Sequence, residues 1–413
     1  MRDNLVVSNP IFEIVKKLQD AGFITYIVGG AIRDLMLGRE PKDYDISTSA
    51  TPEEVRAVFG KRRARIIGKR FRLVHLRLGQ DIIEISTFRR TPETTGQIEG
   101  KVRKKPVPEN MIFRDNEFGT PQEDAWRRDF TVNALFYDPV KDDLIDYTGF
   151  GIDDMHAGIV RAIGEPELRF EEDPVRVLRA LKLVGQYGFK FDPKTQAAVL
   201  KLGDLIVHTP ASRFALEMEK ILKGAYCDGI FEAFHEYSFL GYCMPYLEAN
   251  WNSPARVYSM QLLAERNKRV IEGRYRNSIS LAMAAITLPF IEAEIGFEQH
   301  GKLWAKSQSN NAEIRRVVRD VFQPHNVIKR LALSAFNILN LQPDFFNPDK
   351  KLGRMLRSHG YEHAREMLIL QNNVLWQDES LMQKWPKPMP VNKRRRNKSR
   401  NSRRRKNHAR KSK

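Results

Sequence analysis

The first 150 residues alternate between helical and strand-like spacing of apolar positions. From 9 to 21 apolar residues recur three or four positions apart, which predicts a helix that ends before Gly22. The segment TPEEVRAVF predicts a second helix, capped by Thr51 with Pro52 and Glu54 in its first turn. Strands are predicted for FITYIV, YDIS, RARIIG, FRLVHLRL, DIIEIS and TVNALFYD. The N-terminal part is therefore expected to be a mixed α/β unit.

Beyond residue 173 the strand signals fade and apolar residues follow a helical period. PVRVLRALKLVGQYGF, PKTQAAVLKL and SRFALEMEKILKG show this period, as does much of 255–375. We therefore expect an all-helical C-terminal half. Residues 90–118 form a long polar insertion that contains KVRKKP, which predicts a mobile loop.

Positive charge is concentrated at the C-terminus. The chain of 413 residues has a net charge of +18, and 380–413 contains fifteen Lys or Arg and no Asp or Glu. Subtracting these fifteen leaves only +3 for 1–379. The tail has too few apolar residues to bury a core, so we expect a disordered basic segment. Its partner should be polyanionic, either nucleic acid or an anionic membrane; a solubilising tail is the alternative.

The composition disfavours membrane and disulfide-rich classes. The longest mostly apolar stretch, LAMAAITLPFI, is too short to cross a bilayer, and the N-terminus lacks the apolar run of a signal peptide. Cys227 and Cys243 are the only cysteines and lack metal-ligand spacing, which favours a reducing cytoplasm over a disulfide framework. We expect a cytoplasmic protein without a transmembrane segment.

Two aspartates stand one residue apart in KDYDIST. Side chains alternate across a strand, so Asp43 and Asp45 would share one face, with Cα atoms about 6.5–7 Å apart. Two carboxylates about 4 Å apart repel by roughly 4 kcal/mol at an effective dielectric of about 20. Mg²⁺ or Mn²⁺ would offset that repulsion, and two such ions serve phosphoryl chemistry. A polar strand edge is the alternative, because D-x-D alone is common.

A glycine pair precedes the aspartates and favours phosphate binding. Gly29 and Gly30 follow an apolar run, and successive amides at such a turn form an anion-binding concavity. The pattern matches neither G-x-G-x-x-G nor the Walker loop, and a plain turn is the alternative. A third acid would complete a two-metal site: either Glu84 in the apolar DIIEIS or Asp129 in RRDFTVNAL. Glu84 could equally be an edge-strand residue that faces water.

Five motifs resemble, in order, those of the class II nucleotidyltransferases, the family of CCA-adding enzymes and bacterial poly(A) polymerases. They are GGAIRDLMLG, KDYDIST, RRDFTVNALFYD, IDYTGFGIDD and EEDPVRVLRALKL, within 23–220. IIGKRFRLVHL and the basic C-terminus most resemble the bacterial poly(A) polymerase branch. The resemblance implies an α/β nucleotidyltransferase head with a mixed sheet (1–150), a helical neck (151–245), a helical body (246–379) and the disordered basic tail (380–413).

The resemblance also implies roles for individual residues. The aspartate pair would hold the catalytic metals. Arg128, Asp129 and Asn133 match the motif that holds the incoming nucleotide and senses its ribose. Arg33 and Asp34 match a pair that braces the glycine turn and the triphosphate.

Asp173 and Arg176, three apart, would share a helix face, and the resemblance implies that they contact the edge of the base. Arg only donates and ionised Asp only accepts, so the pair suits N1 and N6 of adenine but equally N3 and N4 of cytosine. Guanine or uracil would leave a donor unpaired, at a cost of about 1–3 kcal/mol. The alternative is a helix-start aspartate beside a surface salt bridge. Arg179 could brace Asp173 or touch the nucleotide. Arg213 and Glu217, four apart, could support this helix from the next one or form an ordinary exposed pair.

The resulting hypothesis is template-independent addition of AMP from ATP to RNA 3′ ends, with release of pyrophosphate and Mg²⁺ or Mn²⁺ as cofactor. The implied partners are ATP, the 3′ ends of mRNA, small RNA and decay intermediates, and RNA-degradation machinery, in mRNA polyadenylation and RNA decay. A tRNA CCA-adding enzyme and a non-catalytic RNA-binding protein on a transferase fold are the alternatives. The tail residues expected to bind RNA are Arg394, Arg395, Arg396, Arg403, Arg404 and Arg405.

Overall fold

The structure is a computed structural model. It describes residues 5–68, 72–79, 81–90, 117–295, 311–324, 329–346 and 351–387. Most of the predicted loop at 90–118 and most of the predicted basic tail lie outside these described residues, so both stay predictions there. The first residues of that tail are ordered: α20 Glu379–Lys384 is a helix and Trp385 is buried, so the predicted start of disorder at 380 is too early.

The chain divides into two compact units, which are described separately. The first comprises Met1–Ser253, Asn267–Asn277 and Asp320–Ile328, and the second comprises Pro254–Arg266, Ser278–Arg319 and Lys329–Lys413. The predicted head and neck both belong to the first unit. The predicted boundary between them at residue 150 stays a prediction.

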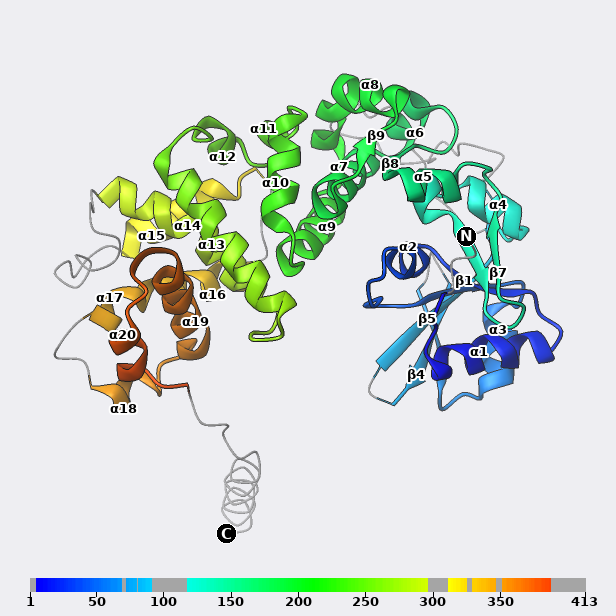
Figure 1. Cartoon of the computed structure of the whole chain (residues 1–413), viewed down its shortest axis with the longest axis horizontal. Coiled ribbons are helices and arrows are strands. Elements are labelled where there is room, and N and C mark those ends of the chain that lie inside the picture. The colour runs from blue at the N-terminus through cyan, green and yellow to red at the C-terminus, as the bar shows by residue number, and fades with distance from the viewer. Residues whose placement is uncertain are drawn as a thin grey trace, which may run out of the picture. The chain divides into compact units, whose positions relative to one another are not determined.

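A seven-stranded sheet lies at the centre of the N-terminal part of the first unit (Figure 1). The strand order is β3-β4-β5-β2-β1-β6-β7, in which β2 and β5 run parallel and the other neighbouring pairs are antiparallel. The predicted mixed-sheet fold class is confirmed. The strands are β1 Thr25–Val28, β2 Asp45–Thr48, β3 Ala64–Ile67, β4 Leu73–Leu78, β5 Asp81–Thr87, β6 Leu135–Asp138 and β7 Asp143–Asp146.

Strand β2 begins later than the sequence predicts. Its first residue is Asp45, and Asp43 lies in the bend just before it, so the two aspartates do not alternate along one strand. Asp45 pairs in register with Glu84 of β5 on one side and with Val28 of β1 on the other. Val28 is the last residue before the glycine pair, so strand register brings the glycine turn, Asp45 and Glu84 together.

Two helices of the N-terminal part form where the sequence predicts them. α1 Asn9–Asp20 buries its apolar face, and α3 Pro52–Phe59 begins with a capping box. In that box the Thr51 hydroxyl accepts from the N–H of Glu54, and the Glu54 carboxylate accepts from the N–H of Thr51 at 2.7 Å. The other helices of this part are α2 Gly30–Met36 and α4 Pro121–Trp126.

Two segments differ from the predicted secondary structure. The expected strand at 131–138 starts with a 3₁₀ turn, Thr131–Asn133, and only then continues as β6. In the helical half, β8 Ile159–Val160 pairs in parallel with β9 Lys190–Phe191. This short pair forms because Gly188 ends the preceding helix in a left-handed conformation and the chain then runs extended.

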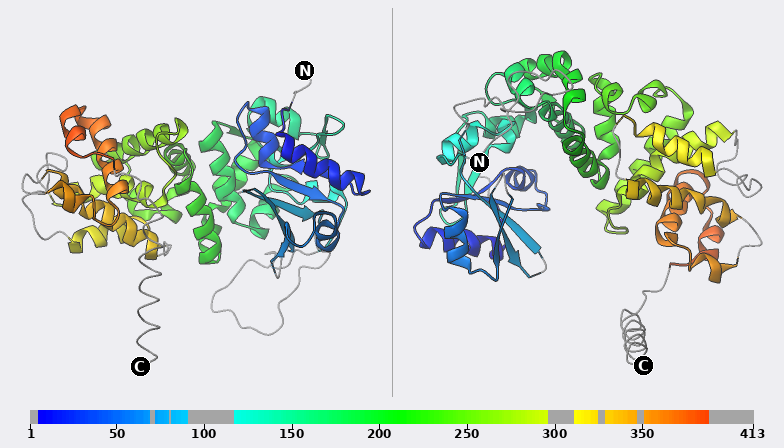
Figure 2. Two further views of the ribbon diagram at one scale, coloured as in Figure 1. Left: turned by 90° about the horizontal axis from the view of Figure 1, so that it is seen from below. Right: turned by 180° about the vertical axis from the view of Figure 1, so that it is seen from behind.

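The rest of the first unit beyond Gly151 is helical, as predicted (Figure 2). α7 buries one apolar face and turns the other toward the cavity described below. The helices are α5 Gly151–Ala157, α6 Pro166–Glu172, α7 Val175–Tyr187, α8 Pro193–Leu202, the 3₁₀ segment Gly203–His208, α9 Ala211–Lys223, α10 Cys227–Glu236, α11 Leu240–Cys243 and α12 Pro245–Ala249.

After Ser253 the regular elements of the described chain are all helices. In the part that the structure describes, no helix is long and apolar enough to cross a membrane. The helices are α13 Pro254–Ile271, α14 Ile279–Ile295, α15 Asn311–Val321, α16 Lys329–Asn340, α17 Gln342–Phe346, α18 Leu352–Met355, α19 Tyr361–Gln371, the π-helical turn Asn372–Trp376 and α20 Glu379–Lys384.

Helices α7 and α10 approach each other at a pair of glycines. A Cβ on Gly185 would lie 2.5 Å from both the carbonyl oxygen of Gly229 and the Cα of Ile230. These are backbone atoms, so the clash cannot be relieved by a rotamer change. We predict that Gly185→Ala lowers the free energy of unfolding by about 1–3 kcal/mol. The measurement is the shift of the urea midpoint.

The matched control for this change is Gly353→Ala in α18, where an added Cβ meets no atom within 4 Å. This substitution should leave the midpoint unchanged or raise it slightly, because Ala favours helix over Gly. Equal midpoints for the two variants would contradict the steric account of the α7–α10 contact.

Candidate active site

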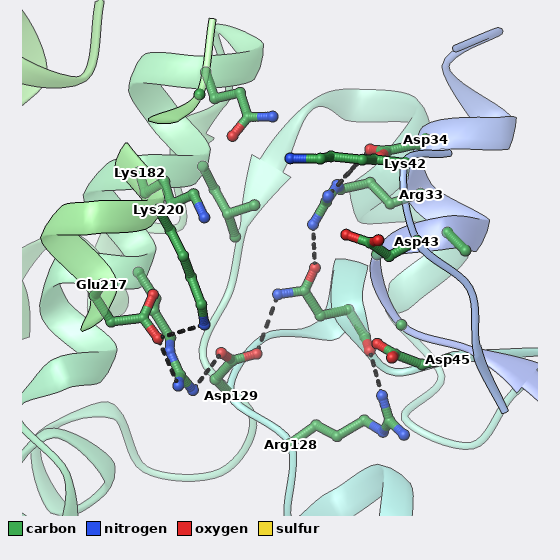
Figure 3. Close-up of a pocket in the computed structure, with 18 of the residues that line it drawn as sticks. Arg33, Asp34, Lys42, Asp43, Asp45, Arg128, Asp129, Lys182, Glu217 and Lys220 are labelled. Atoms are coloured by element: carbon green, nitrogen blue, oxygen red, sulfur yellow. Dashed lines mark hydrogen bonds and ion pairs between the residues drawn. The ribbon is translucent and has the colours of Figure 1, made fainter. Parts of the chain in front are cut away.

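A cavity of about 1140 Å³ lies within the first unit (Figure 3). The glycine turn and residues of β2 and β5 line one side, and α7 and α9 line the other. Fourteen predicted site residues line it: Gly29, Gly30, Arg33, Asp34, Asp43, Asp45, Glu84, Arg128, Asp129, Asn133, Asp173, Arg176, Arg179 and Arg213. Motifs spread over 29–213 thus meet in one place, while the individual roles stay predictions. The six tail arginines predicted to bind RNA lie outside the described residues.

The glycine turn joins β1 to α2. Gly29 has φ 75° and ψ −138°, a conformation that residues with a side chain rarely adopt. A Cβ on Gly29 would also lie 3.2 Å from Nη1 of Arg128. The missing side chain therefore allows the Arg128 guanidinium to approach the turn and keeps the backbone accessible from the cavity.

Asp43 and Asp45 both lie at the cavity wall, although they do not share a strand (Figure 3). The pKa of Asp45 lies above its usual value. Partial desolvation is the largest cause, the negative charges of Glu84 and Asp43 add to it, and Arg128 opposes it. The Asp45 side chain stays accessible to water in the cavity, so this desolvation is incomplete. The direction of the shift shows that the ionised carboxylate lacks sufficient positive charge nearby.

A divalent cation would supply that charge. Among the described residues, no group of three His, Cys, Asp or Glu side chains could hold a metal ion by itself. Glu84 hydrogen-bonds with Nε2 of His75 at 3.3 Å, and its role as a third ligand stays a prediction. A metal held by Asp43 and Asp45 would take its other oxygen ligands from water and nucleotide phosphates, as Mg²⁺ commonly does. The residues present therefore fit Mg²⁺ or Mn²⁺.

Arg128 is fixed by three contacts beside the aspartates. Its Nη2 donates to Oδ2 of Asp124 at 2.9 Å, and its Nη1 donates to the backbone carbonyl of Asn133 at 3.2 Å. The guanidinium also lies 5.1 Å from the ring centroid of Phe136, within the range of a cation–π contact. Asp124 is only 4% exposed, so this anchor is buried. Arg128 therefore presents a fixed positive charge at the edge of the cavity.

A hydrogen-bond chain runs along the floor of the cavity (Figure 3). Oδ1 of Asp129 accepts from the N–H of Phe130 at 2.9 Å and from Nδ2 of Asn133 at 3.1 Å. Oδ1 of Asn133 accepts in turn from Nη1 of Arg33 at 2.6 Å. Arg33 also donates to Asp34 at 3.0 Å. The predicted nucleotide-binding residues thus hold one another in place.

The chain continues onto the helices opposite. Nη1 of Arg179 lies 3.7 Å from Oδ2 of Asp129, and its Nη2 donates to Oε1 of Glu217 at 3.1 Å. Lys220 donates to the same Glu217 oxygen at 3.0 Å. Burial alone would raise the pKa of Glu217, but Arg179 and Lys220 outweigh it and hold that pKa below its usual value. Arg179 was expected to brace Asp173 or to touch the nucleotide. Its ion pairs are with Asp129 and Glu217, and whether it touches the nucleotide stays a prediction.

The expected base-reading pair does not lie on one helix. Asp173 follows α6 in an extended conformation, with φ −149° and ψ 90°, and α7 begins two residues later. Oδ2 of Asp173 accepts from Nη2 of Arg213 at 2.6 Å, so Arg213 of α9 holds this segment. Nη1 of Arg176 donates to Glu172 at 3.0 Å. Each member of the pair is thus held by its own partner, and base recognition stays a prediction.

Several cavity residues escaped the sequence analysis, among them Lys182, Tyr187 and Lys220. Lys182 is three residues beyond Arg179, and Tyr187 is eleven beyond Arg176, so helical spacing along α7 could have indicated both. Burial lowers the pKa of Lys182; Glu217 partly opposes this, and Lys220 adds to it. The α7–α9 wall therefore carries crowded positive charge, which favours an anionic ligand.

Comparisons with known proteins agree with this geometry. Residues 25–161 match the family described as "Poly A polymerase head domain", and 188–250 match "Probable RNA and SrmB- binding site of polymerase A". Poly(A) polymerase I of Escherichia coli O6:H1 is 32% identical over 376 residues, covering 89% of this chain and 79% of that protein. The CCA-adding enzyme of Geobacillus stearothermophilus is 38% identical over 213 residues, covering 52% and 49%.

Among solved structures, the Bacillus stearothermophilus CCA-adding enzyme in complex with CTP matches with a TM-score of 0.62 at 24% identity, covering 92% of this chain and 82% of that one. The fold is therefore that of the class II nucleotidyltransferases. Within that class, the chain belongs to the family of poly(A) polymerases and CCA-adding enzymes, which confirms the predicted resemblance. By family it is an RNA nucleotidyltransferase.

The charge pairing at Glu217 generates a pH-dependent prediction. Because its pKa is lowered in the folded state, ionised Glu217 stabilises the fold above its unfolded-state pKa of about 4.3, and this stability is lost as pH falls through the folded-state pKa. Glu217→Gln should lower the free energy of unfolding by about 1–3 kcal/mol at pH 7, since a neutral amide loses the charge-assisted hydrogen bonds that Arg179 and Lys220 donate to Glu217. The difference from wild type should stay constant from pH 7 to about pH 5 and shrink as the pH falls below about 4.3. Urea unfolding at several pH values measures it.

Glu219→Gln on the same helix is the matched control, because Glu219 does not line the cavity. It should change stability little at any pH. A Glu217→Gln penalty that stays as large below pH 4 as at pH 7 would mean that charge is not what Glu217 contributes.

Proposed function

We propose that this chain transfers AMP from ATP to the 3′ hydroxyl of RNA without a template and releases pyrophosphate. The observation that carries the proposal is the cavity in which Asp43 and Asp45 sit beside the glycine turn and face a wall of cationic side chains. We favour poly(A) addition over CCA addition because the sequence match to Escherichia coli poly(A) polymerase I extends over 79% of that protein. The match to the CCA-adding enzyme of Geobacillus stearothermophilus extends over 49%.

Asp43 and Asp45 would hold Mg²⁺ or Mn²⁺. When bound, the metal lowers the pKa of the attacking hydroxyl and stabilises the departing pyrophosphate. The transfer forms a bond from the 3′ oxygen to the α-phosphorus and breaks the bond from that phosphorus to the bridging oxygen of the β-phosphate. The chain needs no covalent intermediate for this step, because positioning and charge stabilisation suffice.

The protein's own side chains would position the nucleotide. The glycine turn lies at the cavity wall, where a phosphate would contact it, and Arg128 and Lys182 supply positive charge in the same cavity. Asp129, held by Asn133, keeps its second oxygen toward the cavity, where a sugar hydroxyl can donate to it. These contacts serve orientation rather than bond making.

The direct test is nucleotide incorporation. The full chain is mixed with Mg²⁺ and a short unstructured RNA, with each NTP supplied separately, and in parallel with a tRNA that lacks its last residues. Long extension with ATP alone is the expected result. Addition to the tRNA that needs CTP and stops after three residues would support the CCA-adding alternative. No incorporation of any nucleotide, together with RNA binding, would support a non-catalytic RNA-binding protein.

Asp45→Ala tests the role of the acid pair in the same assay. We expect at least a 1,000-fold loss of kcat, which corresponds to about 4 kcal/mol of transition-state stabilisation. Asp153→Ala, at an exposed position of α5 outside the cavity, is the matched control and should keep full activity. An unchanged rate for Asp45→Ala would falsify the metal assignment.

The basic tail should contribute non-specific RNA affinity. If about five of its charges contact phosphates, the log–log slope of affinity against salt includes roughly −3.5 from the tail, at about 0.7 per contact. Replacing the six tail arginines named above by Gln should therefore make the slope shallower by about 3 to 4. Binding of a labelled single-stranded RNA over a salt series measures this.

The matched control replaces six neutral residues of the same tail by Gln and should leave the slope unchanged. These residues are Asn392, Asn397, Ser399, Asn401, Ser402 and Asn407. The same slope for the arginine variant and the control would remove the tail from RNA binding.

A further inference from the structure

Tyr187 uses the full hydrogen-bonding capacity of its hydroxyl within the first unit. A phenol has one donor and two acceptor positions. The hydroxyl donates to Oδ1 of Asp34 at 2.7 Å and accepts from Nη2 of Arg33 at 2.6 Å and from Gln186 at 2.9 Å. Burial, the largest cause, raises the pKa of Tyr187, so the hydroxyl keeps its proton at neutral pH. Removing this one oxygen would disturb three partners.

The ring of Tyr187 also makes cation–π contacts with two arginines, one in α2 and one just after it. The guanidinium of Arg33 lies 4.5 Å from the ring centroid, and that of Arg39 lies 4.9 Å from it. Arg33 and Asp34 are part of α2, whereas Tyr187 ends α7. The side chains of Arg33 and Asp34 are only 12% and 21% exposed, so the contact is partly shielded from water.

Arg33 is connected to the Asp129 carboxylate through the side chain of Asn133. Arg33 can only donate and the Asp129 carboxylate can only accept, so the amide of Asn133 between them has one orientation: oxygen toward Arg33 and nitrogen toward Asp129. Oδ1 of Asp129 is thereby occupied by Asn133 and by the N–H of Phe130. Oδ2 is the oxygen left for a ligand, with Arg179 at 3.7 Å beside it.

Helix α7 therefore holds this loop at two points. Tyr187 acts through Arg33 and Asn133, and Arg179 acts directly on Asp129. The two residues are eight apart, so their attachment points are about 12 Å apart along one rigid helix. If the Tyr187 hydroxyl is lost, Arg33 keeps its hydrogen bonds to Asp34 but loses the one from α7, so the guanidinium and the amide of Asn133 are held less tightly.

We propose that Tyr187 is a positioning residue for sugar recognition: through Arg33 and Asn133 it orients Asp129 so that the carboxylate accepts a hydrogen bond from the ribose 2′ hydroxyl of the incoming nucleotide. This inference rests on the proposed function. A 2′-deoxynucleotide lacks that donor and gains nothing from a correctly oriented carboxylate. Tyr187 therefore contributes to discrimination between ATP and 2′-deoxy-ATP, although it touches neither.

The test compares kcat/KM for ATP and for 2′-deoxy-ATP in the wild type and in Tyr187→Phe. The variant keeps the ring and its stacking but loses the hydroxyl. We expect the ATP to deoxy-ATP ratio to fall by about 3- to 10-fold, the equivalent of one neutral hydrogen bond, mainly through a higher KM for ATP. An unchanged ratio, or an equal loss for both nucleotides with a lowered unfolding midpoint, would overturn the proposal.

Two further variants separate positioning from general damage. Tyr237→Phe removes a hydroxyl from the end of α10, where the ring packs edge-on against Phe191 outside the cavity, and should keep the ratio. Asn133→Ala should lower the ratio on its own, and adding Tyr187→Phe to it should lower the ratio no further, because both act in one chain. Additive effects of the two changes would contradict the path through Asn133.

Failure of the proposed function has a different signature. If the wild type incorporates neither nucleotide into RNA, the proposed reaction is wrong, and equilibrium binding of ATP and 2′-deoxy-ATP still tests Tyr187. In that assay Tyr187→Phe should weaken ATP binding by about 3- to 10-fold and leave deoxy-ATP binding nearly unchanged. Equal affinities of wild type and variant for ATP would then refute the role of Tyr187 itself.

Discussion

The cavity depends on the ion pairs that Arg179 makes with Asp129 on one side and with Glu217 on the other. Burial alone would lower the pKa of Arg179, but Asp129, Glu217 and Asp173 outweigh it and hold the pKa above its usual value. Acids from three segments thus stabilise the charged guanidinium in a partly buried position. Without this cation, the Asp129 and Glu217 carboxylates would lack the counter-charge that they share, which would destabilise the contact of α7 with α9 and the loop after α4.

Charge is divided unevenly across the cavity. On the strand side, the pKa of Asp45 is raised, first by desolvation and then by neighbouring acids. Among the cations, burial lowers the pKa of Lys182, and burial together with four nearby arginines lowers the pKa of Arg127 to about 9. Both walls therefore carry charge that the protein leaves incompletely neutralised. A single ligand that brings a divalent cation to the acids and phosphates to the cations would relieve both, which is the physical reason that a metal-bound nucleoside triphosphate fits this site.

Local chemistry was predictable from sequence, and long-range geometry was not. The capping box at Thr51 and the apolar face of α1 depend on residues a few positions apart, and both were predicted. The motifs placed fourteen residues in one cavity only because the family resemblance linked segments far apart in the chain. Asp43 was misplaced because β2 starts where Asp45 finds pairing partners on β1 and β5, which no local pattern encodes. Tyr187 was missed because its partners are 153 and 154 residues away.

The choice between adenine and cytosine also depends on long-range geometry rather than on residue type. Both bases offer an acceptor beside a donor on the edge that Asp173 and Arg176 would contact, so residue type cannot separate them. Position can, because the edge of a purine lies farther from its sugar than that of a pyrimidine. Asp173 is held at 2.6 Å by Arg213 of α9, and Arg176 at 3.0 Å by Glu172 of α6. If this pair contacts the base, its depth below the sugar would be set by how α6, α7 and α9 pack, and a shift of one helix against another would change which base fits even when the residue types stay the same.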